Sequence, residues 1–312
     1  MAVTVGQTIG EAEYTTLRSG VVIVMGTPSG STATDAAGYN QTLTSGGVNP
    51  GDKILATQWN ELRSDIVKAF THQTGNAPSS PALPTVDTDT GITAQIHNDF
   101  ETVVNFIKDV NNRFDIGTGQ STLSSASSKT KTNWNGTQIH DVTFTWSSAN
   151  EVKAYFNAGG DIRISSSLSY TGSEAKTLDW KDMITDAGTV IIDHASTVIS
   201  GGTAGDNGVV TNNDGWYDLN TTEREVFIKS SDNTNVYAEN DYRVLIRQIT
   251  NGVRVRVMYQ DDDTGDQTGS GAAQDENVKG TLTSALSYNQ PTGGNVSVPA
   301  PTVAYGNTNT FT

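Results

Sequence analysis

Cysteine is absent from this chain of 312 residues. Its absence excludes disulfide bonds and zinc sites built on thiolates. Long apolar runs are missing too, and the longest, VVIVMG, covers only residues 21–26. Because a membrane-spanning helix needs about 20 apolar residues, we predict no membrane span. The opening residues MAVTVGQTIG lack the basic and apolar segments of a secretory signal, so we expect none.

Positive charge is scarce as well. Lys and Arg number 19 against 34 Asp and Glu, which gives a formal net charge of -15. The basic residues are scattered, and Lys129 and Lys131 come closest to a cluster. Because phosphate binding requires clustered Lys and Arg, we expect no nucleic-acid partner. An acidic surface is typical of a protein that stays soluble in a crowded assembly.

Sequence patterns for catalysis and cofactor binding are also missing. None of the four histidines has the spacing of a metal-binding pair. No G-x-S-x-G motif occurs, and the glycine-rich segments 117–122 and 200–208 lack the P-loop lysine. We therefore predict that the chain is not an enzyme and holds no cofactor or metal.

One acidic segment is the best candidate for an ion site. Its carboxylates are Asp261, Asp262, Asp263, Asp266, Asp275 and Glu276. Clustered carboxylates suit Ca²⁺, but Gly265 takes the fifth ligand position of an EF-hand loop. A solvated hairpin loop and an ion site both remain open. A glycoside hydrolase would need two carboxylates at a set distance, which a flexible loop does not fix.

The first third of the chain contains an internal repeat. Residues 6–26 and 51–71 align at an offset of 45, which matches Arg18 with Arg63. A weaker third copy, 91–110, aligns with the second at an offset of 38. Apolar residues recur every three or four positions in each copy, which predicts one amphipathic helix per copy.

These helices supply the candidate packing and docking residues. The candidates are Ile9, Tyr14, Leu17, Ile54, Trp59, Leu62, Ile66, Phe70, Ile92 and Phe100. Their apolar faces either form the core of a small bundle or present a docking or oligomer surface. Three short helices bury little area alone, so a contribution from a neighbouring subunit fits this pattern.

From residue 134 the apolar period changes to two. Val253, Val255 and Val257 alternate with Arg254 and Arg256, which predicts a strand with one buried face. About eight such segments lie between turn signals, as in an antiparallel sandwich or jelly roll. The predicted fold class is α+β, a small N-terminal helical region followed by an antiparallel β-sandwich.

Four regions follow from these patterns. We expect a helical docking region at 1–116, a linker at 117–133, a β-sandwich at 134–290 and an extended arm at 291–312. The linker assignment depends on its Ser, Thr and Gly content. The arm is either a free tail or a segment packed on a neighbouring subunit, since assemblies often exchange segments.

Several motifs resemble those of a known protein group. They are G-Q-T-I…Y-x-x-L-R, G-D-K-I…W-N-E-L-R-x-D-I, W-N-G-T…H-x-V-T-F-T-W-S-S-A, A-Y-F-N-A-G-G-D-I-R-I-S, T-L-D-W-K-D-M-I, W-Y-D-L-N-T-T, D-E-N-V-K-G-T-L-T-S and V-S-V-P-A-P-T. Together they resemble virion structural proteins of tailed marine phages, notably T4-like cyanophages. The resemblance implies a particle component, associated with tail, neck or fibre, and no enzyme.

Three hypotheses about function result. The first is a structural virion protein that self-associates as a ring or trimer and docks to other virion proteins. The alternative is a fibre module that binds a receptor or glycan on the host surface, for which Trp146, Trp180, Trp216 and Tyr217 are the stacking candidates. We expect Trp146 and Trp180 in the core. The third is a hydrolase, for which no carboxylate pair is placed.

Overall fold

The chain forms two compact units. The computed structural model describes residues 9–87, 89, 91–203, 208–232, 237–262 and 277–311. A helical unit comprises Met1–Thr122, Asn150–Gly160 and Gln290–Pro299, and a strand unit comprises Leu123–Ala149, Asp161–Asn289 and Ala300–Thr312. The chain passes between the units five times, after residues 122, 149, 160, 289 and 299. The two units are therefore connected by several chain crossings.

Each repeat begins its helix with its own cap. The helices are α1 (Glu11–Met25), α2 (Ala56–Thr74) and α3 (Ala94–Lys108). The Gly10 amide donates to Glu13 Oε2 at 2.9 Å, and the Leu55 amide donates to Gln58 Oε1 at 2.8 Å. Glu13 and Gln58 occupy equivalent positions of the first two copies. The third copy uses Thr93 instead, whose hydroxyl accepts from the Ile96 amide at 3.2 Å.

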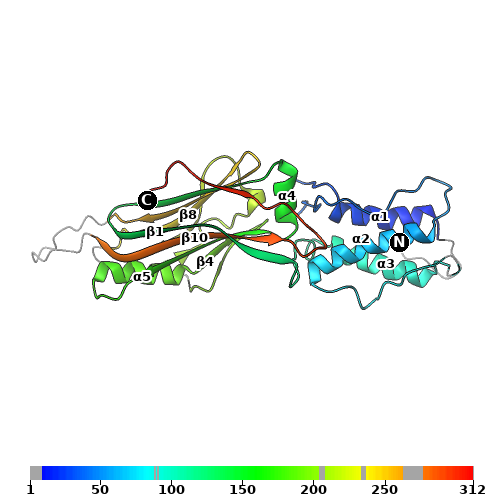
Figure 1. Ribbon diagram of the computed structural model, residues 1–312, viewed down its shortest axis with the longest axis horizontal. Coiled ribbons are helices and arrows are strands. Elements are labelled where there is room, and N and C mark those ends of the chain that lie inside the picture. The colour runs from blue at the N-terminus through cyan, green and yellow to red at the C-terminus, as the bar shows by residue number, and fades with distance from the viewer. Residues whose placement is uncertain are drawn as a thin grey trace, which may run out of the picture. The chain divides into compact units, whose positions relative to one another are not determined.

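The three helices pack against one another in the helical unit (Figure 1). The ring of Trp59 lies at the centre, 6.1 Å from the ring of Tyr14 and 4.9 Å from that of Phe100. Gly20 brings α1 close to Val104 of α3, where a side chain would collide. This core joins all three copies of the repeat, because each copy supplies one of its rings.

The segments that follow α1 and α2 are tied to those helices by equivalent arginines. Arg18 Nε donates to the Ser45 carbonyl at 3.0 Å, and Arg63 Nε donates to the Leu83 carbonyl at 2.6 Å. Buried Asp65 adds a second tie, because its carboxylate accepts from the Ser45 amide at 2.8 Å and hydroxyl at 2.7 Å. Long polar loops are thus fixed without a large apolar core.

A fourth helix, α4 (Ala149–Asn157), also contributes to the helical unit. Asn157 Nδ2 donates to the carbonyls of Ala37 and Gly38 at 3.0 and 3.1 Å. His72 Nε2 hydrogen-bonds the Ala158 carbonyl at 2.8 Å. These bonds secure the loop after α1 and the end of α2.

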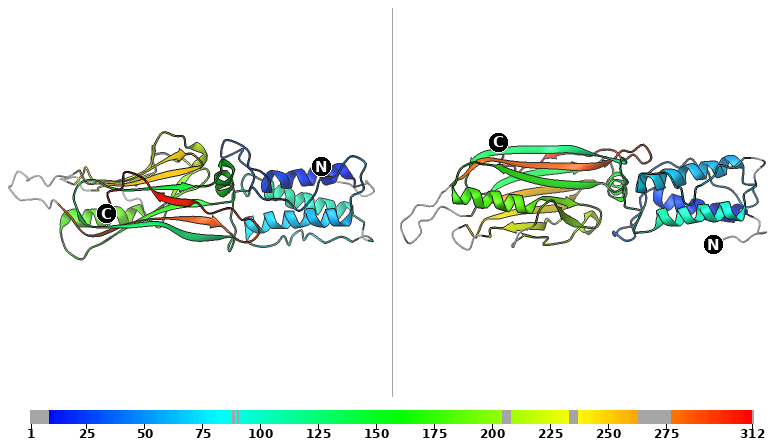
Figure 2. Two further views of the ribbon diagram at one scale, coloured as in Figure 1. Left: turned by 45° about the horizontal axis from the view of Figure 1, so that its top comes forward. Right: turned by 90° about the horizontal axis from the view of Figure 1, so that it is seen from below.

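The strand unit contains two sheets, and Figure 2 shows them as two layers. One sheet has the order β1 (Ser121–Trp134), β10 (Val278–Pro291), β3 (Asp161–Ser169), β4 (Thr189–Ile192) and β5 (Thr197–Ser200). The other has the order β11 (Thr302–Tyr305), β2 (Gln138–Thr145), β9 (Gly252–Gln260), β8 (Asp241–Ile249), β7 (Arg224–Ser230) and β6 (Gly208–Val209). The helix α5 (Ala175–Ala187) packs on β3 and β7, and the short helix η1 (Trp216–Asp218) precedes β7. The predicted α+β class with an antiparallel β-sandwich is confirmed.

The core of the sandwich follows the alternation seen in the sequence. Val253, Val255 and Val257 are fully buried, while Arg254 and Arg256 point to the outer face of β9. Aromatic rings connect the two layers, because Phe144 of β2 lies 6.3 Å from Tyr288 of β10. The period-two pattern therefore identified the buried face of this strand.

Two region boundaries need correction. The expected linker 117–133 is largely strand β1, which lies at the edge of a sheet beside β10. An edge strand forms through backbone hydrogen bonds and leaves most of its side chains to solvent, so Ser- and Thr-rich sequence suffices. The Ser, Thr and Gly content was therefore a misleading signal.

The expected arm 291–312 has two parts. Residues Gln290–Pro299 join the helical unit, where Gln41 Nε2 donates to the Ser297 carbonyl at 3.0 Å. The later part forms β11, which pairs antiparallel with β2 of the same chain. The arm is therefore not a free tail in this structure. Within the described ranges, no helix combines the length and apolar character needed to cross a bilayer.

Candidate docking and self-association sites

The ten candidate docking residues separate into two groups. Six are at most 2 % exposed and form the bundle core: Tyr14, Leu17, Trp59, Leu62, Ile66 and Phe100. The other four are half-buried: Ile9, Ile54, Phe70 and Ile92. Phe70 lies against Phe106 at a ring distance of 4.9 Å, on the outer side of α2 and α3. The structure therefore divides the candidates into packing residues and partly exposed ones.

The three half-buried isoleucines meet at one end of the bundle. Ile9, Ile54 and Ile92 precede α1, α2 and α3, and they line an open cavity of about 440 Å³ together with Gly10, Asp52, Lys53 and Trp59. A smaller cavity of about 260 Å³ shares Ile54 and Ile92. Leu55 stands beside it and is 59 % exposed. We call this surface the bundle-end pocket.

Polar groups at the bundle-end pocket include donors, the Lys53 ammonium and the Trp59 indole, and the carboxylates of Asp52 and Asp87. The indole N–H of Trp59 is buried and has no acceptor among the described residues. The first turns of three helices point their amide groups toward this end, where the side chains of Glu13, Gln58 and Thr93 already accept one hydrogen bond in each turn. The pocket thus combines apolar walls with one unused donor, the Trp59 indole N–H.

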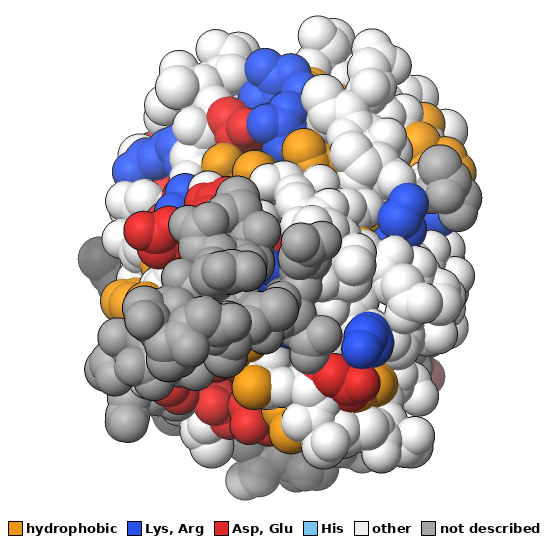
Figure 3. Space-filling model, turned by 90° about the vertical axis from the view of Figure 1, so that its left-hand side faces the viewer, with side chains coloured by type: hydrophobic (Ala, Val, Ile, Leu, Met, Phe, Trp, Pro, Cys, Tyr) orange, Lys and Arg blue, Asp and Glu red, His pale blue; other side chains and the backbone are white. Residues whose placement is uncertain are grey.

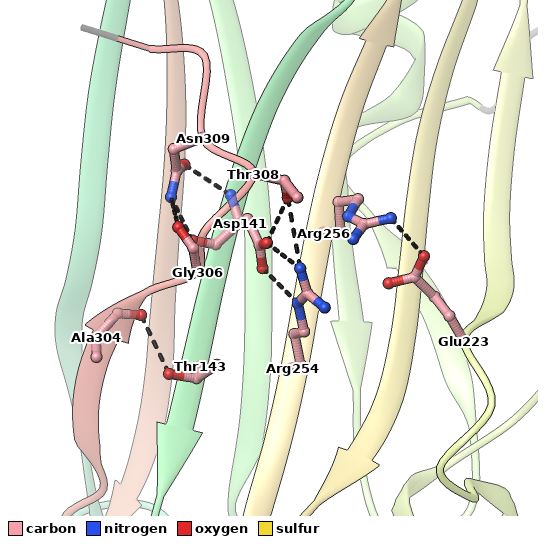
Figure 4. A network of polar contacts seen from close by, with 9 residues as sticks. All are labelled: Asp141, Thr143, Glu223, Arg254, Arg256, Ala304, Gly306, Thr308 and Asn309. Atoms are coloured by element: carbon pink, nitrogen blue, oxygen red, sulfur yellow. Dashed lines mark hydrogen bonds and ion pairs between the residues drawn. The ribbon is translucent and has the colours of Figure 1, made fainter.

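A second cluster lies on the outer face of β2, at Asp141 (Figure 4). The Asp141 side chain is fully buried, although its neighbours His140 and Val142 point into the sandwich core. Its carboxylate accepts from Arg254 Nε at 2.8 Å, from Arg254 Nη2, and from the Thr308 hydroxyl at 2.5 Å. It is covered because the chain after β11 runs over it.

Backbone groups extend this cluster. Asn309 accepts from the Asp141 amide through Oδ1 and donates to the Asp141 carbonyl through Nδ2, both at 2.8 Å. The Gly306 amide donates to the same carbonyl at 2.8 Å. The Thr310 amide donates to the Ile139 carbonyl at 3.0 Å, and the Ile139 amide donates back to the Thr310 hydroxyl at 2.7 Å. We call residues 302–311 the closing segment.

Electrostatics reinforce the cluster. Burial alone would raise the pKa of Asp141, but hydrogen bonds from Arg254 and Thr308 lower it overall. The hydrogen bond to Asp141 in turn raises the pKa of Arg254. Arg256 pairs separately with Glu223 at 2.6 Å. Asp141 therefore remains ionised while it is buried, and it holds the closing segment through charge-assisted hydrogen bonds.

On the opposite face of β2, His140 joins the two sheets. Its Nε2 hydrogen-bonds the Ser127 hydroxyl at 2.7 Å and its Nδ1 the Ser284 hydroxyl at 3.0 Å. Burial lowers the pKa of His140 to about 4. The ring of Phe311 covers it at 5.7 Å. Because all these groups are buried, this Ser–His pair faces the core and is closed to a substrate in this conformation.

Most of the acidic candidate ion site, including Asp263, Asp266, Asp275 and Glu276, lies outside the described residues. Asp261 is described, and it forms a buried ion pair with Lys176 at 2.9 Å. Across the described ranges, no three His, Asp or Glu side chains are grouped to hold a metal ion.

The proposed stacking aromatics are largely inaccessible. Trp146, Trp180 and Trp216 are 6 %, 0 % and 7 % exposed, and Tyr217 is half-buried against Trp216. The core positions expected for Trp146 and Trp180 are therefore observed. On the face seen in Figure 3, described Lys and Arg side chains lie among Asp and Glu and form no continuous basic patch.

No known family model, curated protein or solved structure matches this chain. Sequence reasoning pointed to the bundle-end isoleucines through the repeat. It missed Asp141 and its partners. The only local signal was a carboxylate inside the apolar strand sequence IHDVTFTW.

Proposed function

We propose that this protein is a non-enzymatic structural component of a tailed-phage virion. It associates with itself as a ring or trimer and docks to other virion proteins in the tail, neck or fibre. The bundle-end pocket carries the docking part of this proposal. The phage assignment is supported by the sequence motifs, which resemble those of virion structural proteins.

The pocket supports docking because, among the residues that the structure describes, nothing closes it at the end of a repeated structure. Three equivalent isoleucines converge there, and Leu55 presents further apolar surface. A protein gains little by exposing apolar groups together unless a partner covers them. Each copy of the repeat contributes one wall, so the repeat itself builds the site.

The chemistry of the pocket defines its occupant. Apolar walls around Ile9, Ile54 and Ile92 accept an aliphatic or aromatic side chain. The unused Trp59 N–H favours a carbonyl oxygen beside it, while Asp52 and Asp87 disfavour a carboxylate. The partner is therefore another virion protein that presents an apolar residue next to an acceptor group.

Mass spectrometry of purified phage particles tests the assignment. The protein should be present at a fixed ratio to known particle proteins, and its absence from intact particles would overturn the proposal. A variant Ile54→Asp tests the docking site in the same particles. It should fold but be incorporated at least tenfold less than the wild-type chain.

The matched control is Ile23→Asp. Ile23 is 48 % exposed on α1 and does not line the pocket. This variant should be incorporated normally. Equal incorporation of both variants would exclude the bundle end as the docking surface, and circular dichroism verifies that each variant is folded.

A further inference from the structure

The closing segment fills a groove that is specific for its sequence. Asp141 requires the Thr308 hydroxyl and the Asn309 amide, and Phe311 enters the core beside His140 and Tyr259. Without the segment, a buried carboxylate loses donors and an aromatic site becomes empty. Both changes are costly, so the groove needs an occupant of this sequence.

The covalent connection to the closing segment is short and stiff. Val298 is buried in the helical unit, and only Pro299, Ala300 and Pro301 separate it from β11 in the strand unit. Proline fixes its own φ angle and favours an extended backbone. A short hinge limits how freely a segment closes onto its own chain, and such hinges are connections through which identical segments exchange between copies.

The surface of β2 and β9 can bind the closing segment of its own chain or that of a second copy. Among the described residues, the hydrogen bonds from the closing segment to the rest of the chain go to β2 and β9, and Lys129 of β1 lies over the Tyr305 ring. A segment from another copy forms the same contacts. β11 also pairs at the sheet edge, where an added strand enters without displacing another. Exchange therefore conserves these contacts and adds a link between subunits.

We propose that residues 302–311 are exchanged between copies of this chain, so that each subunit's β2–β9 groove binds the closing segment of a neighbour. This deepens the self-association in the proposed function and names the partner as a second copy. One-way exchange gives the ring or trimer of the proposed function, whereas reciprocal exchange gives a closed dimer. The hinge at Pro299–Pro301 selects between the closed and exchanged forms.

The cysteine-free sequence permits a direct test. Thr143 of β2 and Ala304 of β11 are directly opposite in the antiparallel pair, at a separation that suits a disulfide. Variants Thr143→Cys and Ala304→Cys, each with a different tag, are co-expressed in one cell. Exchange predicts a disulfide-linked heterodimer after mild oxidation.

The control pair is Ser167→Cys with Thr283→Cys, which are opposite each other on β3 and β10. These strands belong to the fixed part of the sandwich, so co-expressed single variants should form at least tenfold less heterodimer. The double variant Thr143→Cys/Ala304→Cys tests the opposite case, in which the closing segment stays on its own chain. Closure only within one chain, with no heterodimer from the mixed single variants, would overturn the proposal.

Native mass spectrometry of the unmodified chain is a second measurement that needs no cysteine. Exchange predicts a dimer or ring whose population falls severalfold in the variant Pro299→Ala/Pro301→Ala. A single-chain mass at all concentrations would also overturn the exchange. These results are independent of incorporation into particles, so the exchange and the virion assignment succeed or fail separately.

Discussion

The two units of this protein cover their apolar surfaces in different ways. The helical unit repeats one local element three times, and its described residues leave the meeting point of Ile9, Ile54 and Ile92 open. The strand unit uses segments far apart in sequence and covers its last groove with residues 302–311. Repetition creates a surface that a partner can cover, whereas long-range pairing allows the chain to cover itself.

The units also differ in where they bury charge. Among its described residues, the strand unit buries the ion pairs of Asp141 with Arg254 and of Asp261 with Lys176. In the helical unit, Asp65 is buried and accepts hydrogen bonds from Thr44 and Ser45. Paired charges make the strand unit sensitive to the loss of one partner, since the remaining charge stays buried.

Removing Asp141 should give the largest effect. Asp141→Ala leaves Arg254 and the closing segment without their acceptor, and should lower the free energy of unfolding of the strand unit by about 3–5 kcal/mol. The control Glu223→Gln breaks the neighbouring, partly exposed pair with Arg256 and should cost about 1 kcal/mol or less. Urea unfolding measures both. Similar losses would show that the closing segment does not depend on this carboxylate.

The same leucine truncation in each core compares the units directly. Leu62→Ala in α2 and Leu286→Ala in β10 each remove a side chain at most 1 % exposed, and each should cost about 3 kcal/mol. We expect each variant to lose stability only in the unit that carries the mutation. Hydrogen exchange read separately for α2 and β9 peptides measures this. Equal deprotection of both units by either variant would show that they unfold as one.

The equivalent arginines Arg18 and Arg63 test whether the first two copies of the repeat fix their following loops in the same way. Arg63→Ala should free the carbonyl of Leu83 and cost about 2 kcal/mol, because the bond involves a charged donor. Arg18→Ala should cost about as much through Ser45. Hydrogen exchange in residues 82–87 and 42–47 follows each loop. If either variant leaves its loop protected, the arginines are not equivalent.

Acid should weaken the helical unit more steeply than the strand unit. Burial lowers the pKa of His72 to about 4, so this unit loses stability as pH falls from about 6.5, the unfolded value, to about 4. Burial also lowers the pKa of His140 to about 4, so the strand unit loses stability over the same pH range. Burial raises the pKa of Asp179 to about 6, however, so its contribution grows as pH falls through 6 and offsets His140. In the helical unit, burial raises the pKa of Asp115 by less, so Asp115 offsets only part of the loss from His72.

Hydrogen exchange of α2 and β9 peptides between pH 6.5 and 4, corrected for the intrinsic exchange rates, measures these slopes. His72→Gln should flatten the dependence of the helical unit and leave that of the strand unit unchanged. Parallel slopes in both units of the wild-type chain would contradict this assignment of the titrating groups.

Local sequence patterns were sufficient for the helices and for single strands. The three copies predicted helices close to the observed α1, α2 and α3, and the alternation around Val255 predicted the buried face of β9. Residues 121–134 were misassigned because Ser and Thr on an edge strand need no apolar face. The bundle-end pocket was predictable only as a set of equivalent isoleucines.

By itself, the sequence determined which residues share a face, because periodicity depends only on near neighbours along the chain. Tertiary structure alone decided that Asp141 is buried, that β1 is a strand and that residues 302–311 close a groove. Each of those outcomes depends on a segment more than a hundred residues away, such as Thr308 above Asp141 or β10 beside β1. Whether a residue is buried or paired depends on its neighbours in space as well as on the residue itself. The local sequence pattern therefore does not predict it.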